Sequence, residues 1–237
     1  AKSLMCLEHI LDASSAVIDP KVFLGYIKYK PTSNHTLTPH LILDKRRYLD
    51  PLNDGQFIID NHQQGKAMII KSDTGTGKTT AFKNFVKRSK TPFISIVSRI
   101  TLGEEQVRIF RKEGINCYFH QEITDTIKDG FMKDGEKQGS SFPKAGFYEY
   151  EGDNIVITID SIMKIGGWGD EEYNPFEGYS VYLDELNSLI EYFLDCPNLS
   201  YKRLVVYKFL IKVLRGADLV VGTDADISDV ALNFFSG

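Results

Sequence analysis

A glycine-rich segment at residues 72–80, SDTGTGKTT, combines the residue types that bind nucleotide phosphates. Gly75 and Gly77 let the backbone turn so that successive amides point toward one anion. A helix beginning near Lys78 would add the positive end of its dipole. The Lys78 ammonium can reach the β and γ phosphates, and the Thr79 hydroxyl can coordinate Mg²⁺, as in the pattern G-x-x-x-x-G-K-[ST]. The segment departs from that pattern once, since a serine replaces the first glycine.

The surroundings of this segment favour a nucleotide site over the alternative, a glycine-rich surface turn. Directly before it, the run Ala67–Ile70 is short and apolar like a strand, and directly after it Thr79–Arg88 has helical spacing. Strand, loop and helix in this order are the setting in which the pattern, known as Walker A, binds ATP with Mg²⁺. The predicted nucleotide-binding residues are Thr74, Gly75, Thr76, Gly77, Lys78, Thr79 and Thr80.

A carboxylate site is predicted where Asp184 and Glu185 follow the apolar run Val181–Leu183. Ligands bind at the carboxyl ends of parallel strands, which is where Asp184 would emerge. With Thr79, Asp184 would hold Mg²⁺ through water, and Glu185 would orient the water that attacks the γ-phosphate. The alternative is that the acidic pair only caps the following helix. The phosphate loop earlier in the chain favours hydrolysis, with Lys78 and Glu185 as the catalytic residues.

A parallel sheet is needed to bring these residues together, and the sequence predicts one. Short, nearly continuous apolar runs are typical of strands covered on both faces, and they occur at 67–70, 93–97, 117–119, 155–159, 181–183 and 219–221. Helical spacing lies between them at 79–88, 102–112, 186–193 and 201–214. This alternation predicts an α/β fold with a mostly parallel sheet flanked by helices, and with the phosphate loop it predicts a P-loop NTPase domain.

The remainder of the chain carries weaker signals. A helix is predicted over 4–18, and residues 20–66 mix short apolar runs with prolines and turns. We therefore divide the chain into a small N-terminal appendage or linker at 1–64 and the ATPase domain at 65–237. Residues 120–152 form a polar, glycine-containing insert without a recognisable motif.

Composition excludes several classes of protein. The 237 residues carry 28 Lys and Arg against 32 Asp and Glu, for a net charge of −4, and 42% are hydrophobic, which predicts a globular chain. No run of about 18 apolar residues could span a bilayer, and no secretory signal is present. Three widely spaced cysteines indicate neither a disulfide scaffold nor a zinc site. We expect an intracellular protein without a membrane partner and, because the sequence opens at Ala1 without Met, a fragment of a longer polypeptide.

Five segments, in order, resemble the helicase motifs of the herpesvirus replication-origin-binding protein family, whose members are superfamily 2 DNA helicases. They read SDTGTGKTT, VSRITLGEEQ, TIDSIMKI, VYLDELNSL and TDADISD, and lie between Met68 and Asp229. Similar proteins occur in large cytoplasmic DNA viruses, joined to primase modules. The resemblance implies that the α/β domain is RecA-like and belongs to an ATP-dependent DNA helicase in viral DNA replication. The protein would then be located in the host cell nucleus or at a cytoplasmic viral replication site.

The resemblance also implies residues that contact DNA. Ser98 and Arg99, with Thr158 and Ser161, would contact the backbone of one strand of single-stranded or duplex DNA. An arginine neutralises a phosphate and hydroxyls donate hydrogen bonds to it, which positions a strand without reading its sequence. The alternative for Arg99 is an ordinary solvated arginine before a helix.

A coupling role is implied for Asp224 and Asp226, which fall where the family links the state of the phosphate to strand movement. The alternative is that they cap a helix beginning near Ser228. Superfamily 2 motors bind ATP between two RecA-like domains, and the second supplies an arginine finger. We expect that second domain elsewhere in the same polypeptide, together with a primase module or other replication proteins as partners. The present chain alone is then expected to hydrolyse ATP weakly or not at all.

Two other functions share the phosphate loop. A small-molecule kinase normally carries an arginine-rich lid, whereas residues 120–152 contain no arginine. A nucleotide-gated scaffold in a replication complex would bind nucleotide without hydrolysing it, and Glu185 argues against that interpretation. DNA-stimulated ATP turnover would separate the three, since a kinase needs a small acceptor and a scaffold has no turnover.

Overall fold

The computed structural model describes residues 48–63, 65–122, 154–165, 174–228, 230–231 and 234. The helix predicted over 4–18 and nearly all of the 120–152 insert lie outside the described residues. The division at residue 64 stays a prediction. In the described part of the chain, no helix is long and apolar enough to cross a membrane.

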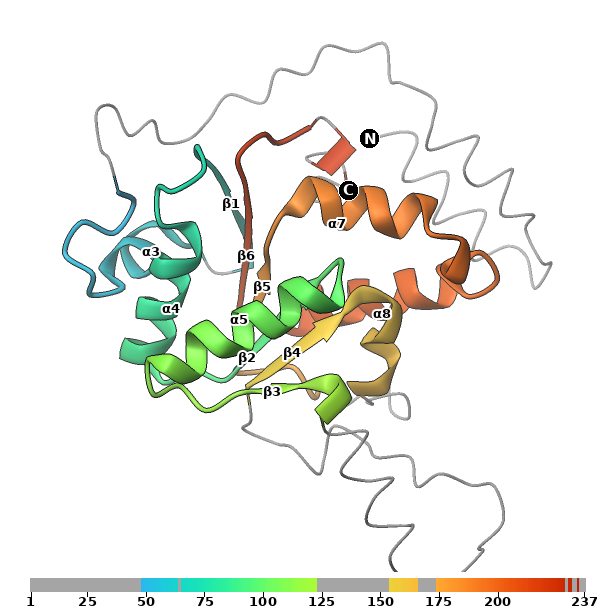
Figure 1. The fold of residues 1–237 in the computed structure, drawn as a ribbon, viewed down its shortest axis with the longest axis horizontal. Helices are drawn as coiled ribbons and strands as arrows, with labels where there is room; N and C mark the ends of the chain where they lie inside the picture. The colour runs from blue at the N-terminus through green and yellow to red at the C-terminus, as the bar shows by residue number, and fades with distance from the viewer. Residues whose placement is uncertain are drawn as a thin grey trace, which may run out of the picture.

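A six-stranded sheet forms the centre of the fold (Figure 1). Its strands are β1 Ala67–Lys71, β2 Phe93–Val97, β3 Tyr118–Phe119, β4 Ile155–Thr158, β5 Ser180–Leu183 and β6 Leu219–Asp224. The order across the sheet is β1-β6-β5-β2-β4-β3, and every neighbouring pair is parallel. The predicted strands and the α/β fold class with a parallel sheet are confirmed. The last predicted residue of the fourth strand, Ile159, instead begins a 3₁₀ helix.

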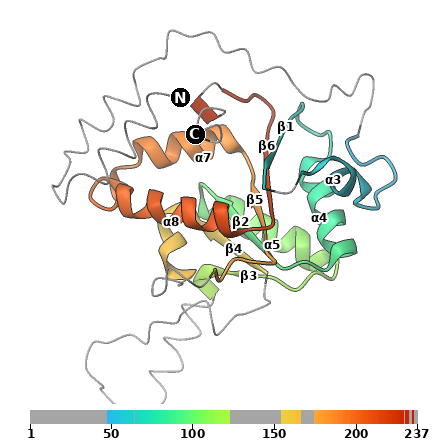
Figure 2. The same cartoon turned by 180° about the vertical axis from the view of Figure 1, so that it is seen from behind.

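Helices cover both faces of the sheet, as parallel strands require. They are α3 Gln56–Asn61, α4 Lys78–Ser89, α5 Ile100–Lys112, α7 Leu186–Asp195 and α8 Arg203–Gly216, with 3₁₀ helices η2 Ile159–Ile165 and η3 Pro197–Leu199. Figures 1 and 2 show α7 and α8 lying together, away from α3 and α4. The four helices predicted from spacing are confirmed, with ends that shift by one or two residues.

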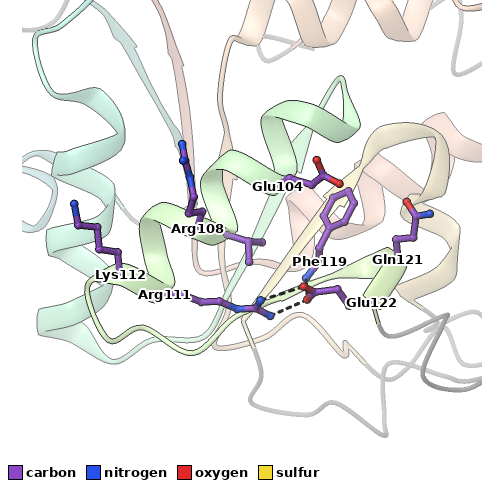
Figure 3. A pocket seen from close by; sticks show the side chains of 8 residues that line it. Glu104, Arg108, Arg111, Lys112, Phe119, Gln121 and Glu122 are labelled. Carbon is purple, nitrogen blue, oxygen red and sulfur yellow. Dashed lines mark hydrogen bonds and ion pairs between the residues drawn. The ribbon is translucent and has the colours of Figure 1, made fainter.

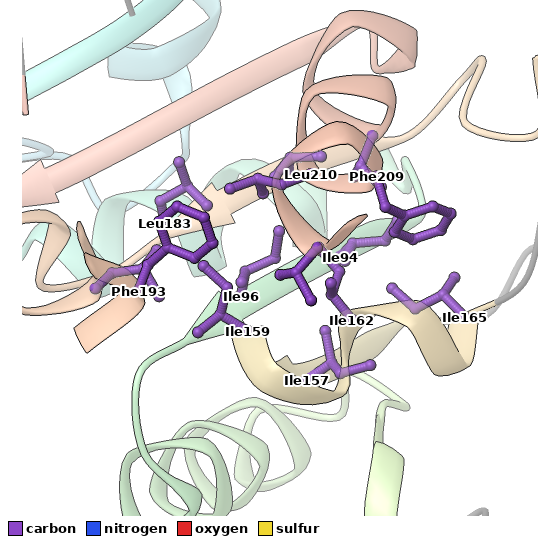
Figure 4. Packing of buried hydrophobic residues seen from close by; sticks show 14 of the residues in the cluster. Ile94, Ile96, Ile157, Ile159, Ile162, Ile165, Leu183, Phe193, Phe209 and Leu210 are labelled. Carbon is purple, nitrogen blue, oxygen red and sulfur yellow. The ribbon is translucent and has the colours of Figure 1, made fainter. Parts of the chain in front are cut away.

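Two hydrophobic cores follow from the alternation of side chains along the strands. Ile94 and Ile96 of β2 belong to the core under η2, α7 and α8, whose packing Figure 4 shows. Phe93 and Val97 of the same strand belong to the core under α3, α4 and α5. One strand therefore helps to fix both helical layers.

An aromatic cluster in the second core ties α4 to β5. The Phe82 ring of α4 stacks on the Tyr182 ring of β5, with centroids 4.3 Å apart and planes within 11°. Phe93 and Phe110 meet Phe82 edge to face, at 5.7 and 6.4 Å. Offset and edge-to-face pairs add about 0.5–1.5 kcal/mol each beyond their burial. The cluster thus holds the helix that follows the phosphate loop against the strand that precedes the acidic pair.

The segment just before β1 packs on α4. The Leu49 amide donates to the Thr76 carbonyl at 3.0 Å. The Asp50 carboxylate accepts from the Gly55 amide at 3.0 Å and from the Asn84 side chain at 2.8 Å. Ile58 of α3 is fully buried in the same core as Phe82. The described end of the N-terminal region therefore braces the phosphate loop and the helix behind it.

Gly55 lies where a side chain has no room. Its φ is +76°, and a Cβ added there would lie 2.5 Å from the Phe85 amide nitrogen on α4. We expect Gly55→Ala to lower the free energy of unfolding by about 2–4 kcal/mol, through backbone strain and a clash with the α4 backbone. Urea unfolding measures this change in the free energy of unfolding. Gly65→Ala is the matched control, because Gly65 has φ +72° but open space around it, so about 1 kcal/mol is expected. Equal losses would contradict the close packing of α3 on α4.

Candidate nucleotide-binding site

The topology of the sheet brings the phosphate loop and the acidic pair to one edge. The loop follows β1 and the pair follows β5, with β6 between these strands. Because all three strands are parallel, their carboxyl ends lie side by side, where open α/β sheets bind ligands. The Thr79 hydroxyl consequently donates to the Asp184 carboxylate at 3.3 Å, across 105 residues of sequence. The sequence prediction that these two side chains meet agrees with this geometry.

The loop has the backbone geometry that phosphate binding requires. Gly75 and Gly77 have φ +81° and +84°, and Gly77 is the N-cap of α4, directly before its first residue, Lys78. A helix start leaves its first amides without partners inside the helix, and the phosphate loop directly precedes the start of α4. The Lys78 ammonium donates to the carbonyls of Ser72 at 2.6 Å and Asp73 at 3.0 Å, so it already lies across the loop.

The serine that replaces the first glycine of the pattern has a partner within the loop. Its hydroxyl shares a hydrogen bond with that of Thr76 at 2.8 Å. Thr76 also donates to the Asp73 carbonyl at 2.8 Å. Ser72 therefore braces the loop from inside, and its Cβ does not prevent the turn.

The Asp184 carboxylate is buried and held by four neutral donors. Its Oδ1 accepts from the Thr223 hydroxyl at 3.0 Å and the Glu185 amide at 3.1 Å. Its Oδ2 accepts from the Gln106 amide at 2.9 Å and the Thr79 hydroxyl at 3.3 Å. Asp184 is only 8% exposed. None of these donors cancels the charge, so the carboxylate suits a cation that approaches beside Thr79.

Tyr182 places a third hydroxyl beneath this group. Its oxygen lies 3.1 Å from the Thr223 hydroxyl and 3.4 Å from the Thr79 hydroxyl. Burial, followed by the nearby Asp184 charge, raises the pKa of Tyr182 well above its ordinary value, so it stays a neutral phenol. Because a phenol has one hydrogen, the Tyr182 hydroxyl can donate to only one of the two threonine hydroxyls at a time.

Glu185 has a left-handed backbone conformation, with φ 50° and ψ 57°, a region that costs a residue with a side chain about 1–3 kcal/mol. It stands at the start of α7, yet its side chain makes no capping bond there. The carboxylate instead lies 3.6 Å from Arg99 Nη2, in a pair exposed on both sides. Exposed pairs are weak, so this contact leaves Glu185 able to move. The geometry does not favour the capping interpretation of Glu185.

Asp224, at the end of β6, caps α7 rather than the helix near Ser228. Its carboxylate accepts from the Asn187 amide in the first turn of α7 at 2.7 Å. The Asn187 side chain in turn donates to the Asp226 carbonyl and accepts from the Ser228 amide at 3.0 Å. The segment after β6 is thereby joined to the helix that follows Glu185. Asp226 itself pairs with Lys71 at 2.7 Å on the surface.

The predicted DNA-contacting residues gather at the ends of two neighbouring strands. β2 pairs with β4 so that Val97 lies opposite Thr158. Ser98 and Thr158 are both 3% exposed, and the Ser98 hydroxyl has no hydrogen-bond partner among the described residues. Arg99 is exposed and Ser161 half-buried. The structure thus brings the four together but leaves only Arg99 and Ser161 open to a strand.

Four residues around the site were not predicted from the sequence: Gln106, Tyr182, Asn187 and Thr223. For Gln106 a signal exists, because the buried positions of α5 are Gly103, Gln106, Val107 and Phe110. A polar residue in the apolar stripe of an amphipathic helix requires a buried partner. The hydroxyls of Tyr182 and Thr223 lie in apolar runs that are typical of strands, so the sequence gives no comparable signal for them.

A separate hollow of about 760 Å³ lies between α5 and β3, and none of its lining residues is a predicted site residue (Figure 3). Arg108, Arg111 and Glu122 line it, and Arg111 makes two hydrogen bonds to Glu122 at 3.0 and 2.7 Å. The bond to Glu122 raises the pKa of Arg111 above its ordinary value. The Arg111–Glu122 pair therefore lies apart from the candidate nucleotide site, which is at the carboxyl edge of the sheet.

Comparison with known proteins gives a distant relationship to helicases. No protein-family model matches the chain. The uncharacterised candidate helicase R8 of Acanthamoeba polyphaga mimivirus is 25% identical over 217 residues, which cover 86% of this chain and 17% of R8. The chain therefore spans about a sixth of that relative. The crystal structure of the DUF1998 helicase MrfA bound to DNA and AMPPNP matches with a TM-score of 0.46 and 14% identity, over 84% of this chain and 29% of MrfA.

Proposed function

We propose that this chain is the ATP-binding motor domain, the first RecA-like half, of a superfamily 2 DNA helicase that acts in viral DNA replication. The observation that carries the proposal is the convergence of Lys78 and Thr79 of one loop with Asp184 of another on a single edge of the sheet. The sequence similarity to a viral helicase-like protein supports the motor class. The narrower resemblance to the origin-binding family, and the cellular location, remain parts of the proposal.

The residues at this edge fit a magnesium nucleotide. The hydroxyl of Thr79 and the carboxylate of Asp184 supply hard oxygen ligands, directly or through water. Among the described residues, no group of three His, Cys, Asp or Glu side chains could hold a metal ion. A metal held here would therefore take its remaining oxygens from phosphate and water, as Mg²⁺ does in NTP sites. Such an ion would neutralise charge on the transferring phosphate.

The chain's own groups would then act in fixed positions. The amides of the loop and the Lys78 ammonium would hold the β and γ phosphates, with Lys78 exchanging its two carbonyl partners for phosphate oxygens. Glu185, beside Asp184, would accept a hydrogen bond from the attacking water. Asp224, Asn187 and Asp226 would transmit changes at this site to the segment after β6. Each of these roles is part of the proposal.

DNA would bind across the ends of β2 and β4. Arg99 is the accessible cation there, and it lies within 3.6 Å of Glu185. A strand phosphate that captures Arg99 would release Glu185 toward the nucleotide, so DNA binding would favour hydrolysis. The accessible groups, the Ser161 hydroxyl and the Arg99 guanidinium, would contact the DNA backbone, so they would not read sequence.

The small-molecule kinase and the nucleotide-gated scaffold are the alternatives, and turnover separates them from a motor. We expect the polypeptide that includes a second RecA-like domain to hydrolyse ATP faster when single-stranded DNA is added, and the present chain to turn over ATP weakly, because the arginine finger would come from that second domain. Phosphate release assays with and without DNA measure both. Turnover that needs a small acceptor and ignores DNA would favour a kinase, and binding without turnover would favour a scaffold.

A further inference from the structure

We infer that Gln106 of α5 is a positioning residue for the metal site: it fixes the Asp184 carboxylate in the orientation that receives Mg²⁺. This inference rests on the proposed function, because it assumes that Asp184 serves a magnesium nucleotide. Among the described residues, the side-chain hydrogen-bond partners of Gln106 are Ser95 and Asp184, and of these only Asp184 is a predicted metal ligand. Its role would be exerted through that carboxylate alone.

The orientation of the Gln106 amide is determined by its two partners. The Ser95 hydroxyl of β2 donates to Gln106 Oε1 at 2.6 Å, and Gln106 Nε2 donates to Asp184 Oδ2 at 2.9 Å. The amide turned by 180° would set its oxygen against the carboxylate, so the network permits one orientation. Ser95 and Gln106 are 0% and 1% exposed, so water does not compete for these bonds.

The cost of placing an amide there indicates that the contact has a purpose beyond packing. Gln106 occupies the buried stripe of α5 between Gly103 and Phe110, where leucine or methionine would pack without desolvating a polar group. Ser95 points from β2 into the same core as the aromatic cluster around Phe93. Two buried hydrogen bonds therefore connect β2 to one carboxylate oxygen: Ser95 donates to Gln106, and Gln106 donates to Asp184.

That oxygen is the one that faces the phosphate loop. Asp184 Oδ2 accepts from both Gln106 and the Thr79 hydroxyl, whereas Oδ1 faces Thr223 and the Glu185 amide. The terminal torsion of an aspartate is broad, so its carboxylate rotates unless both oxygens are held. Without Gln106, Oδ2 would keep only the longer bond to Thr79, so the carboxylate would be held less firmly at the oxygen that a cation beside Thr79 would meet.

The test is the Mg²⁺ dependence of nucleotide binding. A fluorescent, non-hydrolysable ATP analogue is titrated into the 237-residue chain in EDTA and over a range of Mg²⁺ concentrations. We expect Gln106→Leu to raise the half-saturating Mg²⁺ concentration about tenfold, as loss of a residue that orients a metal ligand typically does. Affinity for the analogue in EDTA should stay within about twofold of the unaltered protein, since the phosphate loop is untouched. If Gln106 had only a packing role, its loss would not change the Mg²⁺ dependence while leaving the affinity in EDTA unaltered.

A smaller substitution guards against misfolding of Gln106→Leu. Ser95→Ala removes the hydroxyl behind the amide, and we expect about a threefold rise in half-saturating Mg²⁺. Ser180→Ala is its matched control, because Ser180 is a buried serine on the neighbouring strand β5 whose hydroxyl has no hydrogen-bond partner among the described residues. It should leave the Mg²⁺ dependence unchanged.

The outcomes distinguish this inference from the proposed function. If folded Gln106→Leu, or Ser95→Ala where the former fails to fold, has the Mg²⁺ dependence of Ser180→Ala, the positioning role is wrong while the nucleotide site stands. If the unaltered protein does not bind the analogue, or Lys78→Ala binds it as well as the unaltered protein does, the nucleotide site itself is wrong, and the inference fails with it.

Discussion

Lys78→Ala is expected to abolish binding of ATP to this chain. Lys78 is the one cationic residue within 72–80, and its ammonium donates to the carbonyls of Ser72 and Asp73. In a complex it would donate charge-assisted hydrogen bonds to the β and γ phosphates, each about 1.5–3 kcal/mol. Loss of two such bonds lowers affinity by roughly a hundredfold or more. Isothermal titration calorimetry with Mg²⁺ and a non-hydrolysable ATP analogue measures the change.

Lys87→Ala is the matched control for that loss. Lys87 lies on the same helix, α4, but pairs with Glu113 at 3.7 Å, away from the loop. Its removal should leave affinity unchanged, and both variants should unfold near the temperature of the unaltered protein. If Lys78→Ala and Lys87→Ala bind the analogue equally well, the loop does not hold the triphosphate.

Glu185→Gln is expected to keep nucleotide binding and to stop hydrolysis. The amide retains the size of the side chain but cannot accept a proton from water, and general-base groups contribute about 10²–10⁴-fold to rate. Lys78 and Thr79 donate their side-chain hydrogen bonds to Ser72, Asp73 and Asp184 and not to Glu185, so the affinity for ATP should change little. Single-turnover cleavage of bound, radiolabelled ATP is the appropriate readout, preferably in the polypeptide with both RecA-like domains.

Glu191→Gln supplies the comparison for Glu185→Gln, because Glu191 is an exposed residue of the same helix, α7. It should cleave ATP at the unaltered rate. A rate for Glu185→Gln equal to that of Glu191→Gln would show that another group positions the water. Arg99→Ala would then be measured in the same assay, because Arg99 lies 3.6 Å from Glu185 and its removal tests whether this pair affects cleavage.

The strands, the helices and the meeting of the phosphate loop with Asp184 could be predicted because each depends on local patterns plus one rule of topology. Apolar runs at 93–97 and 181–183 have the length and composition of covered strands, and parallel strands place their carboxyl ends together. Those two facts place Thr79 and Asp184, 105 positions apart in the sequence, at the same edge of the sheet, and the strand order β1-β6-β5 brings them together there.

The contacts around Asp184 could not be predicted, because they join residues that are far apart in the sequence and meet only in the folded structure. Gln106 reaches Asp184 across 78 residues and Thr223 reaches it across 39, and no local pattern encodes either distance. The capping of α7 by Asp224 is similar: the sequence offers a helix near Ser228 as the obvious partner, yet the parallel pairing of β6 with β5 puts the end of β6 beside the start of α7. The left-handed backbone of Glu185 could not be predicted either. It belongs to the turn between β5 and α7, and no residue type that favours this conformation marks the position.

The most direct test of the central claim is a crystal structure of this chain with Mg²⁺ and a non-hydrolysable ATP analogue. We predict that the γ-phosphate lies within hydrogen-bonding distance of Lys78 Nζ, that Mg²⁺ lies between Thr79 and Asp184, and that Glu185 faces the γ-phosphate. An analogue bound elsewhere, for example in the hollow lined by Arg108 and Arg111 with the loop unchanged, would contradict it.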